Sequence, residues 1–343
     1  MQEQIAGQMQ VAAGIGADVI DVHAHALLPE WLEAMKALAR PGRPFTIAGA
    51  AVPQWSEELH LEVMDRHGIA ASILSWPANT AGLSGAPARA LAREMNEHFA
   101  AIVRAHPARF GAFAVLPMDD MAAALDELVY ALDVLGLDGA GCGTHVDGVY
   151  LGDPLFDELL AELHRRQATL FVHPIPPPDF NFKRIGLNAS ILEFMFDTTR
   201  MAAHLVVSGA KARYAKANII CTHGGGTIPY LAPRIGILEP FYGAGPQRRT
   251  LSPEEVQAGL ASFYYDITAT RAPQLDALLQ LAPPDRLMMG TDYPMMTESE
   301  IPPALAAFAK YSGLSQAERT RIASGNALKL FPRLAQARTD IRT

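Results

Sequence analysis

Eight short apolar segments alternate with amphipathic stretches along the chain, and this alternation limits the fold more than any other feature. The expected strands are 18–23, 69–75, 110–117, 137–145, 168–174, 218–223, 263–270 and 287–294. Most are nearly continuous apolar runs, as expected for strands buried on both faces of a parallel sheet. The stretches between them are helical in pattern; one begins after Ser56, a good N-cap, and stops at Gly68. Eight strand–helix units in 343 residues predict a (β/α)8 TIM barrel.

An open, doubly wound sheet is the alternative fold. We favour the barrel because no glycine-rich dinucleotide turn follows the first strand. Two segments fall outside the repeat, an insertion at 26–55 and a helical tail at 298–343. Residues 1–17 are expected to form a loosely held arm. With no internal repeat or low-complexity linker, we expect one barrel domain over 1–343.

Charge and cysteine content exclude several classes of partner. The formal net charge is −8 and no basic run occurs, which argues against nucleic acid and anionic membrane surfaces as partners. No apolar run reaches the roughly 20 residues of a membrane span. The N-terminus lacks a positive region and carries Glu3, so it is a poor signal peptide. Two cysteines are too few for a disulfide framework, which favours a reducing cytoplasm.

Ligand-type side chains gather at the ends of the predicted strands. They are His23, His25, His145, His173, His223, Asp266 and Asp292, and they include five of the 11 histidines. Catalytic residues of such barrels lie at the C-terminal ends of the strands. In "DVHAH", the side chains of His23 and His25 point to the same face if the segment is extended. Paired histidines also occur in ordinary turns, so the pair alone leaves its role open.

Three histidines and a carboxylate form a ligand set that suits zinc, with one position left for water or substrate. Manganese is the alternative ion. His173 in "FVHP" and Asp292 in "GTDYP" each follow a buried run and precede a proline turn, which favours a functional role. For His145, a hydrogen bond within a loop is an equally good explanation. Asp266 is expected to cap a turn or to bond a backbone amide.

The motifs "DVHAH", "LFVHP", "THGGG" and "MGTDYP", in this order, resemble those of the amidohydrolase-related decarboxylases typified by aminocarboxymuconate semialdehyde decarboxylase. The resemblance runs from about residue 18 to about residue 331. It implies that the metal ligands are His23, His25, His173 and Asp292, and that His223 stands beside the metal-bound water. It also implies a homodimer in which Arg234 of "APRI" enters the neighbouring active site and holds a substrate carboxylate. The glycines at 224–226 would let the backbone pass close to the site.

One position departs from the family pattern. Family members that act on aminocarboxymuconate semialdehyde carry an arginine in the insertion, where "FTIA" places Thr46 here. Arg40 or Arg43 is a candidate replacement. Threonine does not replace a bidentate arginine, so a substrate with one carboxylate is favoured, such as a salicylate-type hydroxybenzoate. Decarboxylases of methylsalicylate share this motif set.

These motifs predict a metal-dependent decarboxylase that needs no organic cofactor. Asp292 and His223 are both candidates for the proton donor to the ring carbon. Hydrolysis of an amide, ester or lactone by the same metal-bound water is the rival reaction, and a non-catalytic binding barrel is a weaker rival because no candidate ligand is missing. The end of the fourth strand, "GTHVDG", has no lysine to bridge two metals, which favours a single ion. Trp76, Phe180 and Phe182 are candidate stacking surfaces for the substrate, or packed loop anchors.

Overall fold

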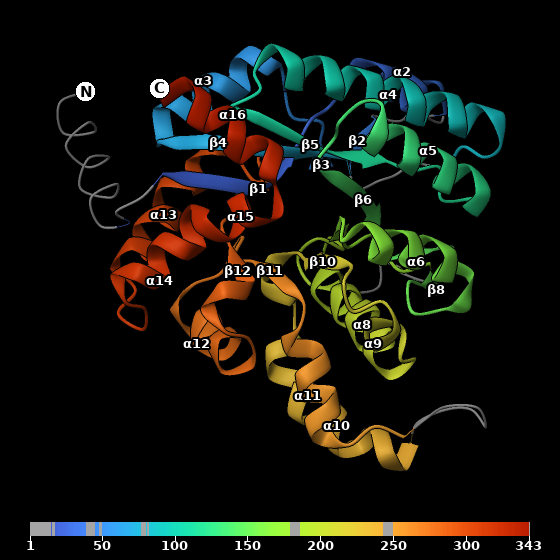
Figure 1. Ribbon diagram of the computed structural model, residues 1–343, viewed down its shortest axis with the longest axis vertical. Helices are drawn as coiled ribbons and strands as arrows, with labels where there is room; N and C mark the ends of the chain where they lie inside the picture. The colour runs from blue at the N-terminus through green and yellow to red at the C-terminus, as the bar shows by residue number, and fades with distance from the viewer. Residues whose placement is uncertain are drawn as a thin grey trace.

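Eight parallel strands form the sheet at the centre of the molecule (Figure 1). The computed structural model describes residues 15, 18–38, 45–47, 50–76, 80, 82–178, 186–242 and 250–342. In sheet order, the strands are β1 (Val19–His25), β4 (Ile69–Ser75), β5 (Phe110–Val115), β6 (Gly139–Gly143), β9 (Thr169–His173), β10 (Asn218–Cys221), β11 (Tyr264–Asp266) and β12 (Leu287–Met288). Hydrogen bonds from Val22 N to Met289 O (3.0 Å) and from His25 N to Tyr293 O (2.7 Å) join the last strand to the first. The predicted TIM barrel is therefore confirmed.

One helix follows each strand along the chain, as the repeat predicts. These helices are α3 (Glu57–His67), α4 (Ala86–Ala105), α5 (Met121–Asp133), α6 (Asp157–Arg166), α8 (Glu193–Val207), α10 (Ile228–Tyr242), α12 (Ala272–Leu281) and α13 (Ile301–Lys310). The expected boundaries of α3 are confirmed: the Ser56 side chain accepts a hydrogen bond from Leu59 N, and Gly68 ends the helix in the left-handed conformation with φ of 68°. Helices α9 (Ala210–Arg213) and α11 (Pro253–Ala261) are additions to the repeat. In the described part of the chain, no helix is both long enough and apolar enough to cross a membrane.

Strand β4 has its predicted bounds, the middle strands are two to four residues shorter than predicted, and the first, seventh and eighth strands differ in ways that affect the site. Strand β1 continues to His25, so both histidines of "DVHAH" lie within the strand. The seventh and eighth strands are much shorter than 263–270 and 287–294. Within the two predicted runs the backbone enters the left-handed region at Ala269 (φ 56°) and Asp292 (φ 61°), which lies outside the extended region that a strand requires.

The insertion and the tail have regular structure of their own. After β1 come α2 (Pro29–Leu38) and a hairpin of β2 (Thr46–Ile47) and β3 (Ala50–Ala51). A second hairpin, β7 (His145–Val146) with β8 (Val149–Tyr150), follows β6. The tail beyond α13 contains α14 (Gln316–Thr320), α15 (Asn326–Leu330) and α16 (Pro332–Arg342).

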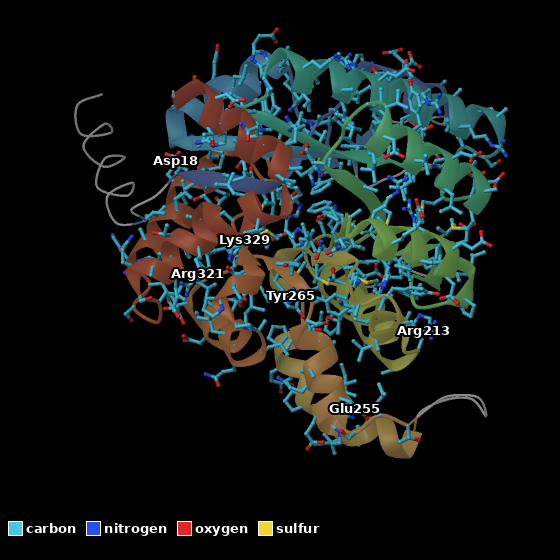
Figure 2. All side chains as sticks on the ribbon, viewed as in Figure 1. Asp18, Arg213, Glu255, Tyr265, Arg321 and Lys329 are labelled. Atoms are coloured by element: carbon cyan, nitrogen blue, oxygen red, sulfur yellow. The ribbon has the colours of Figure 1, made fainter. Side chains whose placement is uncertain are left out.

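The barrel interior is filled by side chains, and the tail closes one end of it. Phe113 and Phe171 stack inside the barrel with ring centroids 5.1 Å apart. Phe331 of the tail packs against Phe113 at 5.7 Å, so the tail seals the N-terminal end of the barrel. A second core lies between the strands and the surrounding helices and includes the fully buried Tyr265 (Figure 2). The opposite, C-terminal end of the barrel holds the candidate site.

Candidate metal centre

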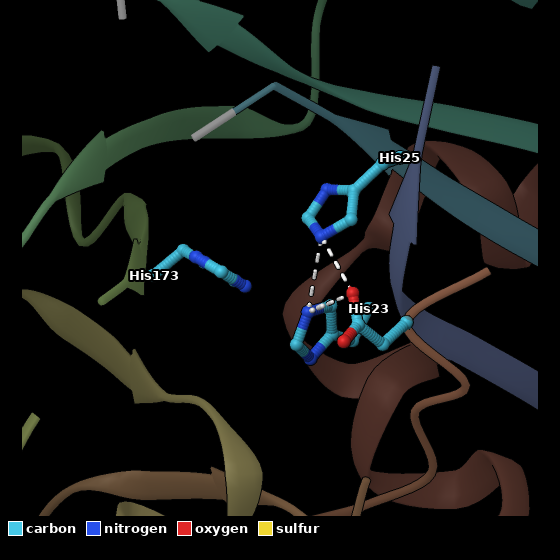
Figure 3. A group of neighbouring side chains, drawn as sticks. His23, His25 and His173 are labelled. Atoms are coloured by element: carbon cyan, nitrogen blue, oxygen red, sulfur yellow. Dashed lines mark hydrogen bonds and ion pairs between the residues drawn. The ribbon is translucent and has the colours of Figure 1, made fainter. Parts of the chain in front are cut away.

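A β-bulge in β1 helps to direct the two histidines of "DVHAH". Asp21 pairs with Ser72 and Ala24 with Leu74, so three steps along β1 face two steps along β4. Such a bulge changes the direction in which the following side chains point. The Nε2 atoms of His23 and His25 lie 3.3 Å apart, and Figure 3 shows His173 of β9 facing the same space.

In each of the three histidines, Nδ1 faces a hydrogen-bond acceptor and Nε2 faces this space. His173 Nδ1 donates to the carbonyl oxygen of Pro174 (2.8 Å), and His23 Nδ1 donates to Asp266 Oδ2 (2.9 Å). The Ser75 hydroxyl donates to Ala24 O (3.0 Å), so its oxygen accepts from His25 Nδ1 (2.9 Å). A proton fixed on Nδ1 leaves Nε2 as the metal-binding atom, as in other metal sites with oriented histidines.

Asp292 completes a group whose atoms fit one metal ion. One ligand atom from each of His23, His25, His173 and Asp292 can be chosen so that all four lie within 4.8 Å of one another, and all four residues are buried. His25 Nε2 lies 3.0 Å from Asp292 Oδ1. His173 Nε2 is buried and has no hydrogen-bond partner among the described residues. Buried polar atoms are normally satisfied, so this orphaned nitrogen together with the donor set fits a bound divalent ion.

The charges of the site also favour a cation. Burial alone lowers the pKa of His23, but the carboxylates of Asp266 and Asp292 more than offset it and raise the pKa to about 10. Burial would raise the pKa of Asp292, yet the charge of His23 and hydrogen bonds from the neighbouring histidines bring it well below its usual value. Both shifts mean that the site stabilises positive charge next to an ionised Asp292.

His223 lies beside this group. Its Nε2 is 3.5 Å from Asp292 Oδ2, and its backbone N–H donates to Asp266 Oδ1 (3.0 Å). The backbone of His223 is left-handed, with φ of 54°, a conformation that costs energy in a non-glycine residue and occurs often at functional sites. The glycines that follow allow a close approach to α8, since a Cβ atom at Gly226 would clash with the backbone of Met195.

The other predicted site residues have different surroundings. Trp76 is buried after β4, with its ring 6.3 Å from that of His25 and 4.2 Å from that of Trp31. Arg234 is exposed on α10, and no hydrogen bond or ion pair among the described residues links it to the four grouped side chains. Thr46 is exposed in β2. The remaining candidates, Phe180, Phe182, Arg40 and Arg43, lie outside the described residues.

Two supporting residues were missed or only partly foreseen from the sequence. Asp266 does bond backbone amides, as expected, those of His223 and Thr268, but its second oxygen also orients His23. Nothing in the sequence singles out Ser75, which ends β4 next to the site. His145 accepts a hydrogen bond from Gly148 N (3.1 Å) within its hairpin, which agrees with the loop explanation.

Three imidazoles and a carboxylate at the C-terminal mouth of a TIM barrel define a metal-centred barrel of the amidohydrolase type. The family model described as amidohydrolase matches residues 20–333, and the chain belongs to this family. Within it, the chain belongs with the amidohydrolase-related decarboxylases, to which its motifs correspond.

Several known proteins to which the chain is similar are named as decarboxylases. It is 35% identical to the decarboxylase yanB of Aspergillus niger, over 95% of this chain and 90% of that protein. It is 34% identical to the 6-methylsalicylic acid decarboxylase of Penicillium expansum, over 92% of this chain and 96% of that protein. Among solved structures, the 2,6-dihydroxybenzoate decarboxylase from Rhizobium aligns with a TM-score of 0.74 at 26% identity, covering 92% of this chain and 99% of that one.

Proposed function

We propose that this chain is a metal-dependent, non-oxidative decarboxylase of a salicylate-type hydroxybenzoate, with 6-methylsalicylate as the first candidate substrate. The observation that carries the proposal is the convergence of three oriented Nε2 atoms and the Asp292 carboxylate on one point. The similarity to 6-methylsalicylic acid decarboxylases supports the substrate class. Exposed Thr46 at the position of the family arginine supports a substrate with one carboxylate.

His23, His25, His173 and Asp292 would hold the ion, which we propose to be zinc or a similar divalent metal. A divalent ion at this point would act as a Lewis acid that favours ionisation of the substrate hydroxyl and fixes the ring. Direct loss of CO2 from an aryl carbon is energetically costly because it leaves a poorly stabilised carbanion. That cost is avoided when an acid protonates the carbon before CO2 leaves.

His223 and Asp292 are the side chains that would manage this proton. The 3.5 Å between His223 Nε2 and Asp292 Oδ2 lets a proton pass between them after a small shift. Asp266 fixes the backbone N–H of His223 and so holds the imidazole beside Asp292. We propose that the two act as a unit: Asp292, ionised in the resting site, takes a proton from His223 and delivers it to the carbon, and His223 regains a proton from solvent. After CO2 leaves, the electron pair of the broken carbon–carbon bond restores the aromatic ring, and the phenolate takes its proton from solvent.

The substrate class can be tested with a panel of compounds. We expect purified, metal-loaded protein to convert hydroxybenzoates with a hydroxyl next to the carboxylate, followed by the change in UV absorbance. Benzoates with the hydroxyl at the para position are the matched control and should not react, because their two oxygens cannot reach one ion. Turnover of esters or lactones, with no reaction of any hydroxybenzoate, would instead indicate a hydrolase.

We also propose that the protein forms a homodimer in which Arg234 serves the partner's active site, in a reducing cytoplasm. Helices α10 and α11 extend away from the barrel (Figure 1). On α10, Tyr230 (84% exposed) and Ile237 (58% exposed) are spaced to share a helix face with Arg234. Exposed apolar side chains beside an arginine are typical of a protein interface. In a C2 dimer this face would meet the same face of the partner.

Subunit mixing tests this arrangement. Two inactive parents, Asp292→Asn and Arg234→Ala, are unfolded and refolded together. If Arg234 acts in trans, each mixed dimer has one site with both groups intact, so about a quarter of all sites should regain activity by C2 counting. If Arg234 acts within its own subunit, activity stays at the level of the parents. That result would refute the shared site and leave the metal centre untouched.

A further inference from the structure

Asp21 is a buried carboxylate that the proposed reaction does not use. Its side chain is 1% exposed and accepts three hydrogen bonds. Oδ1 accepts from His23 N (3.0 Å) and Thr291 N (3.0 Å), and Oδ2 accepts from Thr291 Oγ1 (2.6 Å). A buried carboxylate is costly unless it is fully hydrogen-bonded, and here each bond goes to a neighbour of a proposed metal ligand or to the ligand itself.

The bond to His23 N stabilises the bulge in β1. A bulge leaves an extra residue without its regular partner in the sheet. This extra residue of β1 lies between Asp21 and Ala24. There the backbone N–H of His23 donates its hydrogen bond to the Asp21 side chain. The carboxylate therefore supports the local backbone that directs both His23 and His25 to the site.

The hydrogen bonds from Thr291 to Asp21 fix the segment after β12, which carries Asp292. The Thr291 hydroxyl donates to Asp21 and accepts from Tyr293 N (3.1 Å). One threonine side chain therefore fixes the residue before Asp292 and the residue after it. Asp292 N itself donates to His23 O (2.7 Å). This clamp holds Asp292 in its left-handed conformation, with φ of 61°, which an unsupported aspartate would leave.

We infer that Asp21 is a positioning residue that sets the metal-binding geometry by clamping β1 to the segment after β12, so that His23, His25 and Asp292 keep one arrangement. This inference rests on the proposed metal centre. Its chemistry requires an aspartate: asparagine has one acceptor oxygen where aspartate has two, and its amide cannot accept the Thr291 hydroxyl hydrogen. Loss of such outer hydrogen bonds typically lowers metal affinity by about 10- to 100-fold.

The test measures binding of cobalt(II) by the metal-stripped protein. Chelator competition gives the affinity, and the visible absorption of the ion reports its ligand geometry. Asp21→Asn should bind cobalt(II) about 10- to 100-fold more weakly and with an altered spectrum. Asp138→Asn is the matched control, because the Asp138 side chain is also buried and accepts a strand amide, that of Ala112 (3.0 Å), together with bonds from Arg333. Thermal unfolding of both apo variants reports the general loss of stability.

A second pair of variants covers the case in which Asp21→Asn does not fold. Thr291→Val removes the hydroxyl and should weaken cobalt(II) binding, whereas Thr291→Ser keeps the hydroxyl and should restore it. Wild-type affinity and spectrum in Asp21→Asn or in Thr291→Val would overturn the inference. An equal loss of affinity in Asp138→Asn would also overturn it, since the effect would then follow stability alone. If wild-type protein binds no cobalt(II), the metal centre itself is refuted.

Discussion

His223→Ala should keep its metal and lose kcat by about 100-fold or more, as expected for a lost acid–base group. The physical reason is its position: Nε2 lies 3.5 Å from Asp292 Oδ2, while the other three histidines and Asp292 already supply the ligand set. Removal of this imidazole leaves the ligands in place and takes away the proposed proton relay. Steady-state turnover of a hydroxybenzoate and elemental analysis of the same sample measure the two effects.

His145→Ala is the matched control for this prediction. His145 is another buried histidine beyond a strand end, but it bonds Gly148 within a hairpin and lies outside the metal group. Its variant should retain most activity. Near-normal turnover of His223→Ala would refute the role of His223 in chemistry, and loss of the metal from that variant would reassign His223 to the ligands.

His173→Ala should lose most of its metal and, with it, nearly all activity. His173 is the proposed ligand from β9, across the barrel from β1, and its Nε2 has no hydrogen-bond partner among the described residues. Without it, only three of the four protein ligands remain, and they come from β1 and from the segment after β12. Metal content per chain, measured after dialysis against metal-free buffer, gives the result.

His98→Ala provides the control for metal content. His98 lies on α4, where its ring pairs with Glu30 at 3.0 Å, far in the sequence from every proposed ligand. That variant should hold as much metal as the wild-type protein. Full metal retention by His173→Ala would remove His173 from the ligand set, whatever its effect on turnover.

The barrel and most of the metal group followed from local patterns in the sequence. The caps at Ser56 and Gly68 depend on neighbouring residues alone, and the structure has both as predicted. The rule that strand ends meet at one face of a barrel gathered seven candidate ligands, and the resemblance to the decarboxylase family selected from them the four that the structure groups, His23, His25, His173 and Asp292. Patterns of this kind are readable because each depends on a short segment and on one known architecture.

The supporting contacts were not predictable in this way. His25 bonds Ser75, 50 residues away, and His23 bonds Asp266, 243 residues away. Which strand-end residues touch depends on the register of neighbouring strands, and at Ile20 and Asp21 the pairing of β1 with β4 is offset by one residue from the pairing before and after them. A shift of one residue changes the face to which side chains point, so hydrophobic patterning alone could not fix these partners.

The predicted lengths of the seventh and eighth strands were wrong for a related reason. The apolar runs near β11 and β12 continue beyond the strands, because the loops that carry Thr268 and Tyr293 are buried as well. Apolar character reports burial, and only the backbone conformation distinguishes a buried loop from a strand. The proposed role of Arg234 depends in addition on a second copy of the chain, which no single-chain pattern describes.

Release of labelled CO2 from 6-methylsalicylate tests the central claim most directly. The substrate carries carbon-13 in its carboxyl group, and mass spectrometry follows the gas while chromatography follows the phenol. We predict that metal-loaded protein forms labelled CO2 and 3-methylphenol in equal amounts, that metal-stripped protein forms neither, and that added divalent metal restores both. Equal rates with and without metal, or no labelled CO2 from loaded protein that still turns over an ester or lactone, would contradict a metal-dependent decarboxylase.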